Sequence, residues 1–335
     1  MKYRTLGRTG LEVSEIGFGC GNVGGLMIRG SHQEQIEAVS RALELGINYF
    51  DTAPLYGNGQ SETNLGKVLA ELKPDVKVAT KFSINSEDLA DIRGTVESSL
   101  ETSMKRLGLD SVDVLQLHTQ LSLERGGDDR RWSVTVNEVL GNNGIADAMD
   151  VVRSQGLVRF TGFTGLGETG ALHQVIDSGR FDVMQSYYNL LNPSAGVAVP
   201  PGFSDHNFRQ LIDRAMDRNM GVVVIRVMAG GALGGEVART GHAAPTIGGA
   251  IAGGADYKDD EARAEKLDFL LSGDITSLPQ TAVRFALMHK GVSTVLVGYS
   301  NIQQIEEAAG CSGKGPIPEP SMEKLAELWA TDFTG

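Results

Sequence analysis

The sequence GINYFDTAPLYGNGQSETNLG, residues 46–66, decides the fold class of this chain. It starts as an apolar, β-rich run and ends as a helix-forming run that we expect to begin at Ser61. Asp51 and Tyr56 lie between the two runs, just past the apolar residues. A strand followed at once by a helix is the repeating unit of parallel α/β folds, whose functional side chains follow the strand ends. The stretch therefore predicts a strand, a helix and a candidate site between them.

The same order of elements repeats along the chain. Eight β-rich runs alternate with runs of helical period: SEIGFG (14–19), NYFDTA (48–53), KVATKF (77–82), DVLQLH (113–118), VRFTGFT (158–164), VMQSYY (183–188), GVVVIRV (221–227) and TVLVGY (294–299). Ser31 and Glu34 form a capping box at one helix start, and Ser277 begins a helix that we expect to stop at Gly291. Eight such units in 335 residues favour a closed (β/α)8 TIM barrel over an open doubly wound sheet.

Three segments fall outside this repeat. KYRTLG (2–7) and LEVSEI (11–16) predict an N-terminal β-hairpin that closes the bottom of the barrel. Residues 119–137 and 228–277 are long loops after the fourth and seventh strands, and loops of this length are usually functional lids or disordered. No linker rich in Pro, Ser or charge divides the chain, so we expect one domain over residues 1–335.

The composition argues against several classes of function. A formal net charge of -12 disfavours nucleic acid as a partner, because phosphate backbones bind basic surfaces. No run approaches the roughly 18 apolar residues of a membrane span. Cys20 and Cys311 are too few for a disulfide framework, and the six histidines lack metal-ligand spacing. We therefore expect a cytoplasmic protein without nucleic acid, membrane or metal partners; the oligomeric state stays open.

Residues 19–24, GCGNVG, match the GxGxxG pattern of a Rossmann dinucleotide site. In that motif the third glycine packs inside the helix that follows the first strand. Here GLMIRG (25–30) precedes the helix that Ser31 caps, and 43 glycines make a chance match easy. We therefore interpret the stretch as a flexible loop at the barrel mouth.

Four polar residues follow successive strands. Asp51 and Tyr56 follow the second strand, Lys81 ends the third and His118 ends the fourth, so a barrel brings all four to one mouth. A phenol has an ordinary pKa of about 10, and an ammonium at about 4 Å stabilises the phenolate by roughly 4 kcal/mol at an effective dielectric of 20. We expect Lys81 to lower the pKa of Tyr56 and Asp51 to hold the ammonium in place. His118 would orient a substrate oxygen.

This set can move a proton at a carbonyl or alcohol oxygen, but it contains no source of hydride. Its motifs resemble those of the aldo-keto reductases, a barrel family that uses nicotinamide cofactors. Besides residues 46–66, the resemblance rests on VATKF, DVLQLH, GFTGLGE, MQSYYNLLN and VLVGYSNIQQIEEA, and it covers essentially the whole chain. It implies Tyr56 as general acid or base, Lys81 and Asp51 as its tuning partners, and His118 as substrate orienter. The hydride would come from NADP(H) or NAD(H) lying across the barrel mouth.

The resemblance also implies which residues contact this cofactor. Ser300 with Gln303 matches a capping box, which would leave amides at a helix N-terminus for a phosphate. A well-capped helix without a ligand explains that pattern equally well. The residues implied near the cofactor are Gly21, Asp51, Thr164, Gln185, Arg226, Gly298, Ser300 and Gln304.

Three positions depart from the family pattern. Gly165 stands where many members have an asparagine that binds the nicotinamide carboxamide. Arg226 stands where many have an aromatic ring against the nicotinamide, although a guanidinium also stacks on flat rings. Gly298 and Gln304 replace the Lys and Arg that bind the 2′-phosphate in NADPH-preferring members, so the choice between NADH and NADPH stays open.

Several functions fit these residues. The first is an NAD(P)H-dependent carbonyl reductase acting on small aldehydes or ketones. The GFTG turn and the weak phosphate site are similar to a subgroup that oxidises sugars and pyridoxal-like alcohols with NAD. The same fold also serves as a non-catalytic, cofactor-binding regulatory subunit, against which the complete set of four residues argues. Lys81 as a Schiff-base nucleophile is a further alternative, but a lysine held by Asp51 stays protonated.

Overall fold

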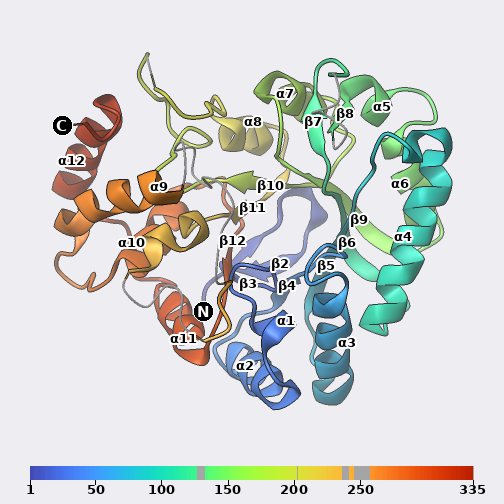
Figure 1. Cartoon of the computed structure of the whole chain (residues 1–335), viewed down its shortest axis with the longest axis horizontal. Helices are drawn as coiled ribbons and strands as arrows, with labels where there is room; N and C mark the ends of the chain where they lie inside the picture. Colours follow the sequence, from blue (N-terminus) through green and yellow to red (C-terminus); the bar gives the residue numbers. More distant parts are fainter. Residues whose placement is uncertain (127–132, 202, 236–240, 245–256, 335) are drawn as a thin grey trace.

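The computed structural model describes residues 1–126, 133–201, 203–235, 241–244 and 257–334 (Figure 1). Eight parallel strands close into a barrel, and each coincides with one of the eight predicted runs, although β6 begins one residue before its run. In order around the barrel they are β3 (Ile16–Gly19), β4 (Tyr49–Asp51), β5 (Lys77–Phe82), β6 (Val112–Leu117), β9 (Val158–Thr164), β10 (Val183–Tyr187), β11 (Gly221–Ile225) and β12 (Thr294–Gly298). Pairing of Val295 with Ile16 and of Gly298 with Gly19 joins β12 to β3. The predicted barrel is confirmed, and the open sheet is excluded.

Helices follow the barrel strands in turn and surround them (Figure 1). One helix after each strand gives α2 (His32–Glu44), α3 (Gln60–Leu72), α4 (Ile92–Leu107), α6 (Ile145–Ser154), α7 (Thr169–Asp177), α8 (Leu211–Asp217), α10 (Leu278–Met288) and α11 (Ile302–Gly310). The additional elements are α1 (Leu26–Arg29), α5 (Val136–Leu140), α9 (Tyr257–Ala264), α12 (Glu319–Ala330) and the 3-10 helices η1 (Gly7–Thr9), η2 (Asp88–Asp91), η4 (Ala229–Gly234) and η5 (Glu265–Leu270).

The helix ends follow local capping chemistry. The Ser31–Glu34 capping box is present at the start of α2, as predicted. Ser277 caps α10 by accepting a hydrogen bond from the amide of Gln280. This helix ends at Met288, earlier than the predicted stop at Gly291, because His289 adopts extended backbone angles. The segment GLMIRG (25–30), which precedes α2, contains the short helix α1.

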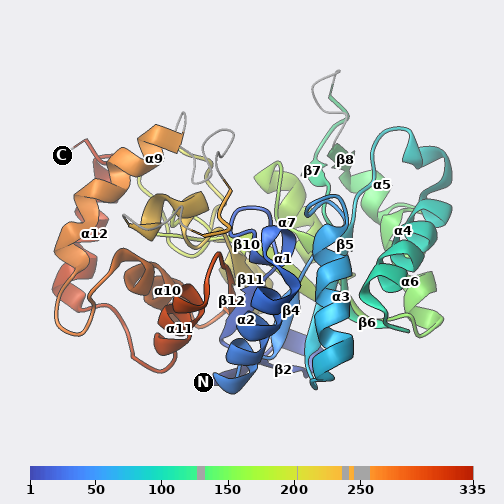
Figure 2. The ribbon, with the colours of Figure 1, turned by 60° about the horizontal axis from the view of Figure 1, so that its bottom comes forward.

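The N-terminal hairpin closes one end of the barrel. Its strands β1 (Tyr3–Thr5) and β2 (Glu12–Ser14) pair antiparallel, and Figure 2 shows β2 at the opposite end of the barrel from β7 and β8. Leu6, Leu11 and Val13 are buried with side chains from inside the barrel, including those of Tyr49, Ala79, Val114, Val183, Val223 and Leu296. Gly7 permits this docking, since a Cβ there would lie 2.2 Å from the Gly221 nitrogen. The hairpin is confirmed.

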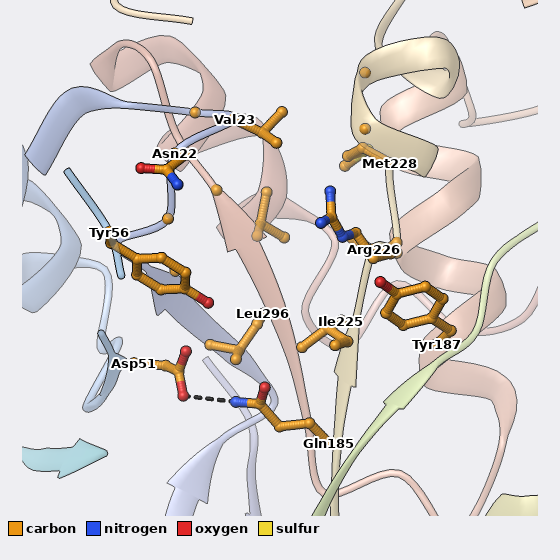
Figure 3. Close-up of a pocket in the computed structure, with 18 of the residues that line it drawn as sticks. Asn22, Val23, Asp51, Tyr56, Gln185, Tyr187, Ile225, Arg226, Met228 and Leu296 are labelled. Carbon is orange, nitrogen blue, oxygen red and sulfur yellow. Dashed lines mark hydrogen bonds between the residues drawn. The ribbon is translucent and has the colours of Figure 1, made fainter. Parts of the chain in front are cut away.

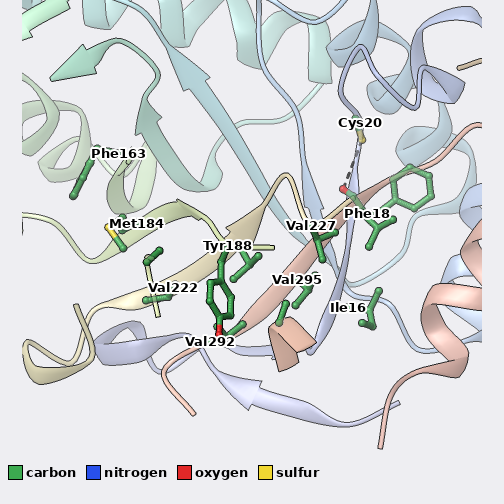
Figure 4. Close-up of a cluster of buried hydrophobic side chains, with 14 of the residues drawn as sticks. Ile16, Phe18, Cys20, Phe163, Met184, Tyr188, Val222, Val227, Val292 and Val295 are labelled. Carbon is green, nitrogen blue, oxygen red and sulfur yellow. Dashed lines mark hydrogen bonds between the residues drawn. The ribbon is translucent and has the colours of Figure 1, made fainter. Parts of the chain in front are cut away.

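Side chains along several barrel strands alternate between two buried clusters, as the two-residue period of a strand requires. In β11, Val223 faces the barrel interior, whereas Val222 and Val224 join the larger cluster between the barrel and its helices. Figure 4 shows part of this outer cluster, with Ile16 and Val295 from neighbouring strands. Its members extend from β3 to the C-terminal Phe333. Both cysteines are buried and unpaired.

The two long connections contain some regular structure. After β6, β7 (Gln120–Ser122) pairs in parallel with β8 (Ser133–Thr135). After β11 the chain forms η4, α9 and η5. Whether residues 228–277 form an ordered lid falls partly outside the described residues. Of the helices in the described ranges, none is both long and apolar enough to span a lipid bilayer.

Candidate active site

A cavity of about 410 Å³ lies at the mouth of the barrel, at the carboxyl ends of the strands (Figure 3). It extends from Tyr56 and His118 on one side to α11 on the other. Ten of the predicted site residues line it: Gly21, Asp51, Tyr56, His118, Thr164, Gln185, Arg226, Gly298, Ser300 and Gln304. Lys81 is fully buried beneath the cavity. The structure therefore brings all the predicted residues to one place.

Lys81 connects the polar residues at the base of the cavity. Its Nζ donates hydrogen bonds to Asp51 Oδ1, to the Thr52 carbonyl oxygen at 2.8 Å and to Tyr56 Oη at 3.3 Å. The other carboxylate oxygen of Asp51 accepts from Gln185 Nε2 at 2.6 Å and from Gln116 Nε2 at 3.2 Å. Every oxygen of this buried carboxylate is thus partnered, and the ammonium faces the phenol.

The loop that carries Tyr56 is fixed from both sides. Asn22 Oδ1 accepts the amide of Gly57 at 2.9 Å. Ser61 Oγ donates to the Cys20 carbonyl oxygen at 2.9 Å. Helix α3 starts at Gln60, one residue earlier than predicted, with Gly59 at its N-cap. The Tyr56 ring meets His118 edge to face, with centroids 5.9 Å apart.

The protonation states follow from burial and charge. Burial raises the pKa of Tyr56 above its ordinary value, and the Lys81 ammonium only partly opposes this increase. The predicted net decrease is therefore wrong for the cavity as the structure shows it, because desolvation outweighs the attraction between the charges. Burial disfavours the Lys81 ammonium, but Asp51 and Tyr56 together more than offset this effect and hold the pKa of Lys81 above its usual value. Burial, Lys81 and Arg226 lower the pKa of His118 to about 3, so its imidazole is neutral.

Two buried polar atoms in the cavity wall lack partners among the described residues. These are Thr164 Oγ1 and His118 Nδ1, and both residues line the cavity. An unpartnered buried hydroxyl or ring nitrogen is costly unless a ligand or water satisfies it. Gly165, beside Thr164, cannot be replaced by asparagine without backbone movement, because a Cβ would lie 2.7 Å from the Gln185 carbonyl oxygen. This contact explains the glycine at that position.

The far end of the cavity differs from the prediction in its capping. The N-cap of α11 is Asn301, whose side chain accepts from the amide of Gln304. The predicted box of Ser300 with Gln303 is wrong by one residue. Instead, Gln304 Oε1 accepts from the Ser300 amide at 2.8 Å and from its hydroxyl at 3.1 Å. Glu307, one turn further, also lines the cavity.

A short strap joins the two walls of the cavity. The Ala244 amide donates to the Val23 carbonyl oxygen at 2.8 Å, and Val23 lines the cavity. The His242 amide donates to the Ser300 carbonyl oxygen at 3.4 Å on the opposite wall. Arg29 Nε donates to the His242 carbonyl oxygen at 2.8 Å. Residues 241–244 therefore link the loop after β3 to the loop after β12.

Four polar residues of the site were not predicted from the sequence: Asn22, Gln116, Tyr187 and Glu307. Gln116 looked like an ordinary strand residue, although its position two before His118 places both side chains on the same face of the strand. Asn22 stood inside the GxGxxG match that was set aside. Within the described residues, no three His, Cys, Asp or Glu side chains gather as a metal ion would require.

Comparisons with known proteins agree with this fold. A model of the aldo/keto reductase family matches residues 15–330. The chain is 30% identical over 314 residues to L-galactose dehydrogenase of Arabidopsis thaliana, covering 92% of this chain and 86% of that protein. It is 26% identical over 339 residues to pyridoxal 4-dehydrogenase of Microbacterium luteolum, covering 91% of each. It is also similar, with a TM-score of 0.70 and 23% identity, to the holo form of aldo-keto reductase AKR11C1 from Bacillus halodurans, covering 98% of this chain and 96% of that one.

Proposed function

The chain belongs to the aldo/keto reductase family, and we propose that it transfers a hydride between NAD(H) and the carbon of a small alcohol or carbonyl compound. Family membership indicates an oxidoreductase. The observation that carries the proposal is the buried chain of contacts from Asp51 through Lys81 to the hydroxyl of Tyr56. The Tyr56 phenol lines a cavity of about 410 Å³, which is large enough for small-molecule ligands.

In this mechanism Tyr56 is the general acid and base. In carbonyl reduction, its hydroxyl donates a proton to the substrate oxygen, and Lys81 stabilises the phenolate that forms. In alcohol oxidation, the phenolate takes the hydroxyl proton. Neutral His118 donates or accepts one hydrogen bond at the same oxygen and orients it. Asp51 keeps Lys81 charged and in place.

The residues present fit a nicotinamide dinucleotide. When bound, this cofactor supplies or accepts the hydride that no side chain can provide. The unpartnered Thr164 hydroxyl suits the nicotinamide carboxamide. Asp51, Gly21 and Gln185 line the same part of the cavity.

We propose NAD(H) rather than NADP(H) for the far end of the cavity. The lining there includes Ser300, Gln304 and Glu307, and among the described lining residues Arg226 is the one cation. A 2′-phosphate carries two negative charges and binds where arginine or lysine is present. The Glu307 carboxylate would repel it.

The relatives support an alcohol as the substrate. Two of them are named as dehydrogenases, one of L-galactose and one of pyridoxal. We propose a sugar or a pyridoxal-like alcohol as the substrate class. Carbonyl reduction is the reverse of the same reaction, and protonated Tyr56 suits it.

The first test measures turnover and binding together. With NAD+ and L-galactose, other aldoses or pyridoxal, the purified protein should increase the absorbance of NADH. With NADH and a panel of aldehydes, it should decrease that absorbance. Tyr56→Phe should lower kcat by about 100-fold to 10,000-fold, because it removes the acid-base group. Its Kd for NADH should stay within about threefold of wild type, and NADH should bind more tightly than NADPH.

A folded wild-type protein that binds cofactor without any turnover would point to a regulatory subunit instead. If Tyr56→Phe loses cofactor affinity in parallel with rate, the role proposed for Tyr56 is wrong. Tighter binding of NADPH than of NADH would overturn the cofactor assignment.

A further inference from the structure

Arg226 occupies a strained position at the cavity wall. It directly follows β11 and has a backbone φ of 60°, in the left-handed region that side chains other than glycine rarely adopt. Asn189 Nδ2 donates to its carbonyl oxygen at 3.0 Å and so fixes this backbone. Strain of this kind persists only where the surroundings hold it, and it concentrates at functional sites. The backbone thereby sets the direction of the side chain.

The Arg226 guanidinium has no compensating charge. In the described part of the chain, no hydrogen bond or ion pair is formed by its side chain. Its one ring neighbour is Tyr187, whose centroid lies 5.9 Å from the guanidinium carbon. Arg263 and Arg284 differ from it, because each forms an ion pair with an aspartate. Figure 3 shows the Arg226 side chain across the cavity from Tyr56.

At the Tyr56 end of the cavity, the other ionisable side chains are paired or neutral. The Asp51 carboxylate is paired with Lys81 and accepts two amide hydrogen bonds. His118 is neutral at physiological pH. Glu307 is at the α11 end of the cavity and is bound by the Ser277 hydroxyl. Arg226 therefore leaves about one unit of positive charge where Tyr56, Thr164 and the substrate would meet.

A positive charge at this place would interact differently with the two forms of the cofactor. The oxidised nicotinamide ring is positively charged, and the reduced ring is neutral. Resting on the proposed function, we infer that Arg226 binds the reduced cofactor in preference to the oxidised one and thereby favours alcohol oxidation. In that direction the substrate C–H bond breaks, its two electrons and hydrogen pass as hydride to the ring, and the hydroxyl proton passes to the Tyr56 phenolate. The substrate would thus be oxidised and the ring reduced, and the repulsion that Arg226 would exert on a positively charged ring would be relieved.

The competing explanation is that Arg226 pairs with an anionic group of the substrate. The two explanations make different claims about cofactor binding in the absence of substrate. Charge discrimination requires a difference between NADH and NAD+ that depends on residue 226. Pairing with the substrate requires no such difference between NADH and NAD+.

The experiment measures Kd for NADH by fluorescence and Kd for NAD+ by competition, without substrate. The proteins are wild type, Arg226→Met, Arg226→Lys and the control Lys290→Met. Lys290 lines a separate cavity at the hairpin end of the barrel, so its replacement makes the same change in net charge away from the site. Thermal unfolding confirms that each variant is folded.

We expect the ratio of the NAD+ Kd to the NADH Kd to fall by at least fivefold in Arg226→Met. It should stay near the wild-type value in Arg226→Lys, which keeps the charge but loses the planar stacking surface, and in Lys290→Met. An unchanged ratio in Arg226→Met overturns the inference and supports substrate pairing. A ratio that falls equally in Arg226→Lys assigns the effect to stacking and also overturns it. Failure of wild type to bind either form overturns the proposed function itself, and so the two failures are distinguishable.

Discussion

At the scale of single residues, Tyr56 determines how the reaction depends on pH. Burial raises its pKa, so the phenol is protonated below about pH 10. Carbonyl reduction uses the protonated form and should keep its kcat/KM through neutral pH, then fall at alkaline pH. Alcohol oxidation uses the phenolate, so its kcat/KM should still be rising at about pH 9. His118 should add no inflection between about pH 5 and 8, because its pKa is lowered to about 3.

Rate profiles in both directions, measured in overlapping buffers at constant ionic strength, check this prediction. In Lys81→Met, the alkaline inflection of the rate profiles should move to higher pH, because this variant lacks the ammonium that opposes the increase in the pKa of Tyr56. An oxidation rate that reaches its plateau below pH 8 would show that the pKa of Tyr56 is lowered in the working complex.

The identities of these residues could be read from the sequence, but their energetics could not. Asp51, Tyr56, Lys81 and His118 stand at strand ends, and the barrel alone brings such ends together. The sign of the Tyr56 pKa shift depends on how far the cavity excludes water. That quantity depends on side chains from many parts of the chain, so a local motif does not determine it.

At the scale of elements, the strap of residues 241–244 should control cofactor exchange. Arg29 donates to the carbonyl oxygens of both His242 and Asn22, and so joins the strap to the loop after β3. Arg29→Ala should raise the NADH dissociation rate by roughly three- to tenfold, because it removes charge-assisted hydrogen bonds. Stopped-flow displacement of NADH by excess NAD+ measures that rate.

Arg93→Ala is the matched control for this prediction. Arg93 is exposed on α4 and pairs with Glu97 one turn along the same helix. Its replacement should leave the dissociation rate unchanged. Equal rates for wild type and Arg29→Ala would mean that the strap does not restrain the cofactor.

The type of each element was predictable from the sequence, whereas the residue at which a helix begins was not. Ser300–Gln303 and Asn301–Gln304 both offer a capping residue followed three positions later by glutamine. The structure uses the second pair, since the Asn301 side chain accepts from the Gln304 amide. Both candidates satisfy the local rule, and only the direction in which the chain leaves β12 decides between them.

At the scale of the whole molecule, repetition made the barrel predictable. A single strand and helix pair fits many α/β folds, whereas eight such pairs in succession favour a closed parallel barrel. The long connections break that repeat, which is why β7 and β8 were not predicted. We propose that residues 1–335 unfold as one domain, because the outer buried cluster already combines β3 with the C-terminal Phe333.

A substitution in the N-terminal hairpin tests whether the chain unfolds as one domain. Leu6 is fully buried against the barrel interior, at the end opposite the cavity. Leu6→Ala should therefore lower the free energy of unfolding by about 2–5 kcal/mol, seen as one shifted transition in urea. Leu271→Ala, at a side chain that is 39% exposed, should cost clearly less. Because Leu6 acts on stability and lies at the end of the barrel opposite the cavity, the kcat of Leu6→Ala should differ from that of wild type by less than about twofold. A second unfolding transition, or a single transition at the wild-type urea concentration, would show that the hairpin is not part of the same cooperative core.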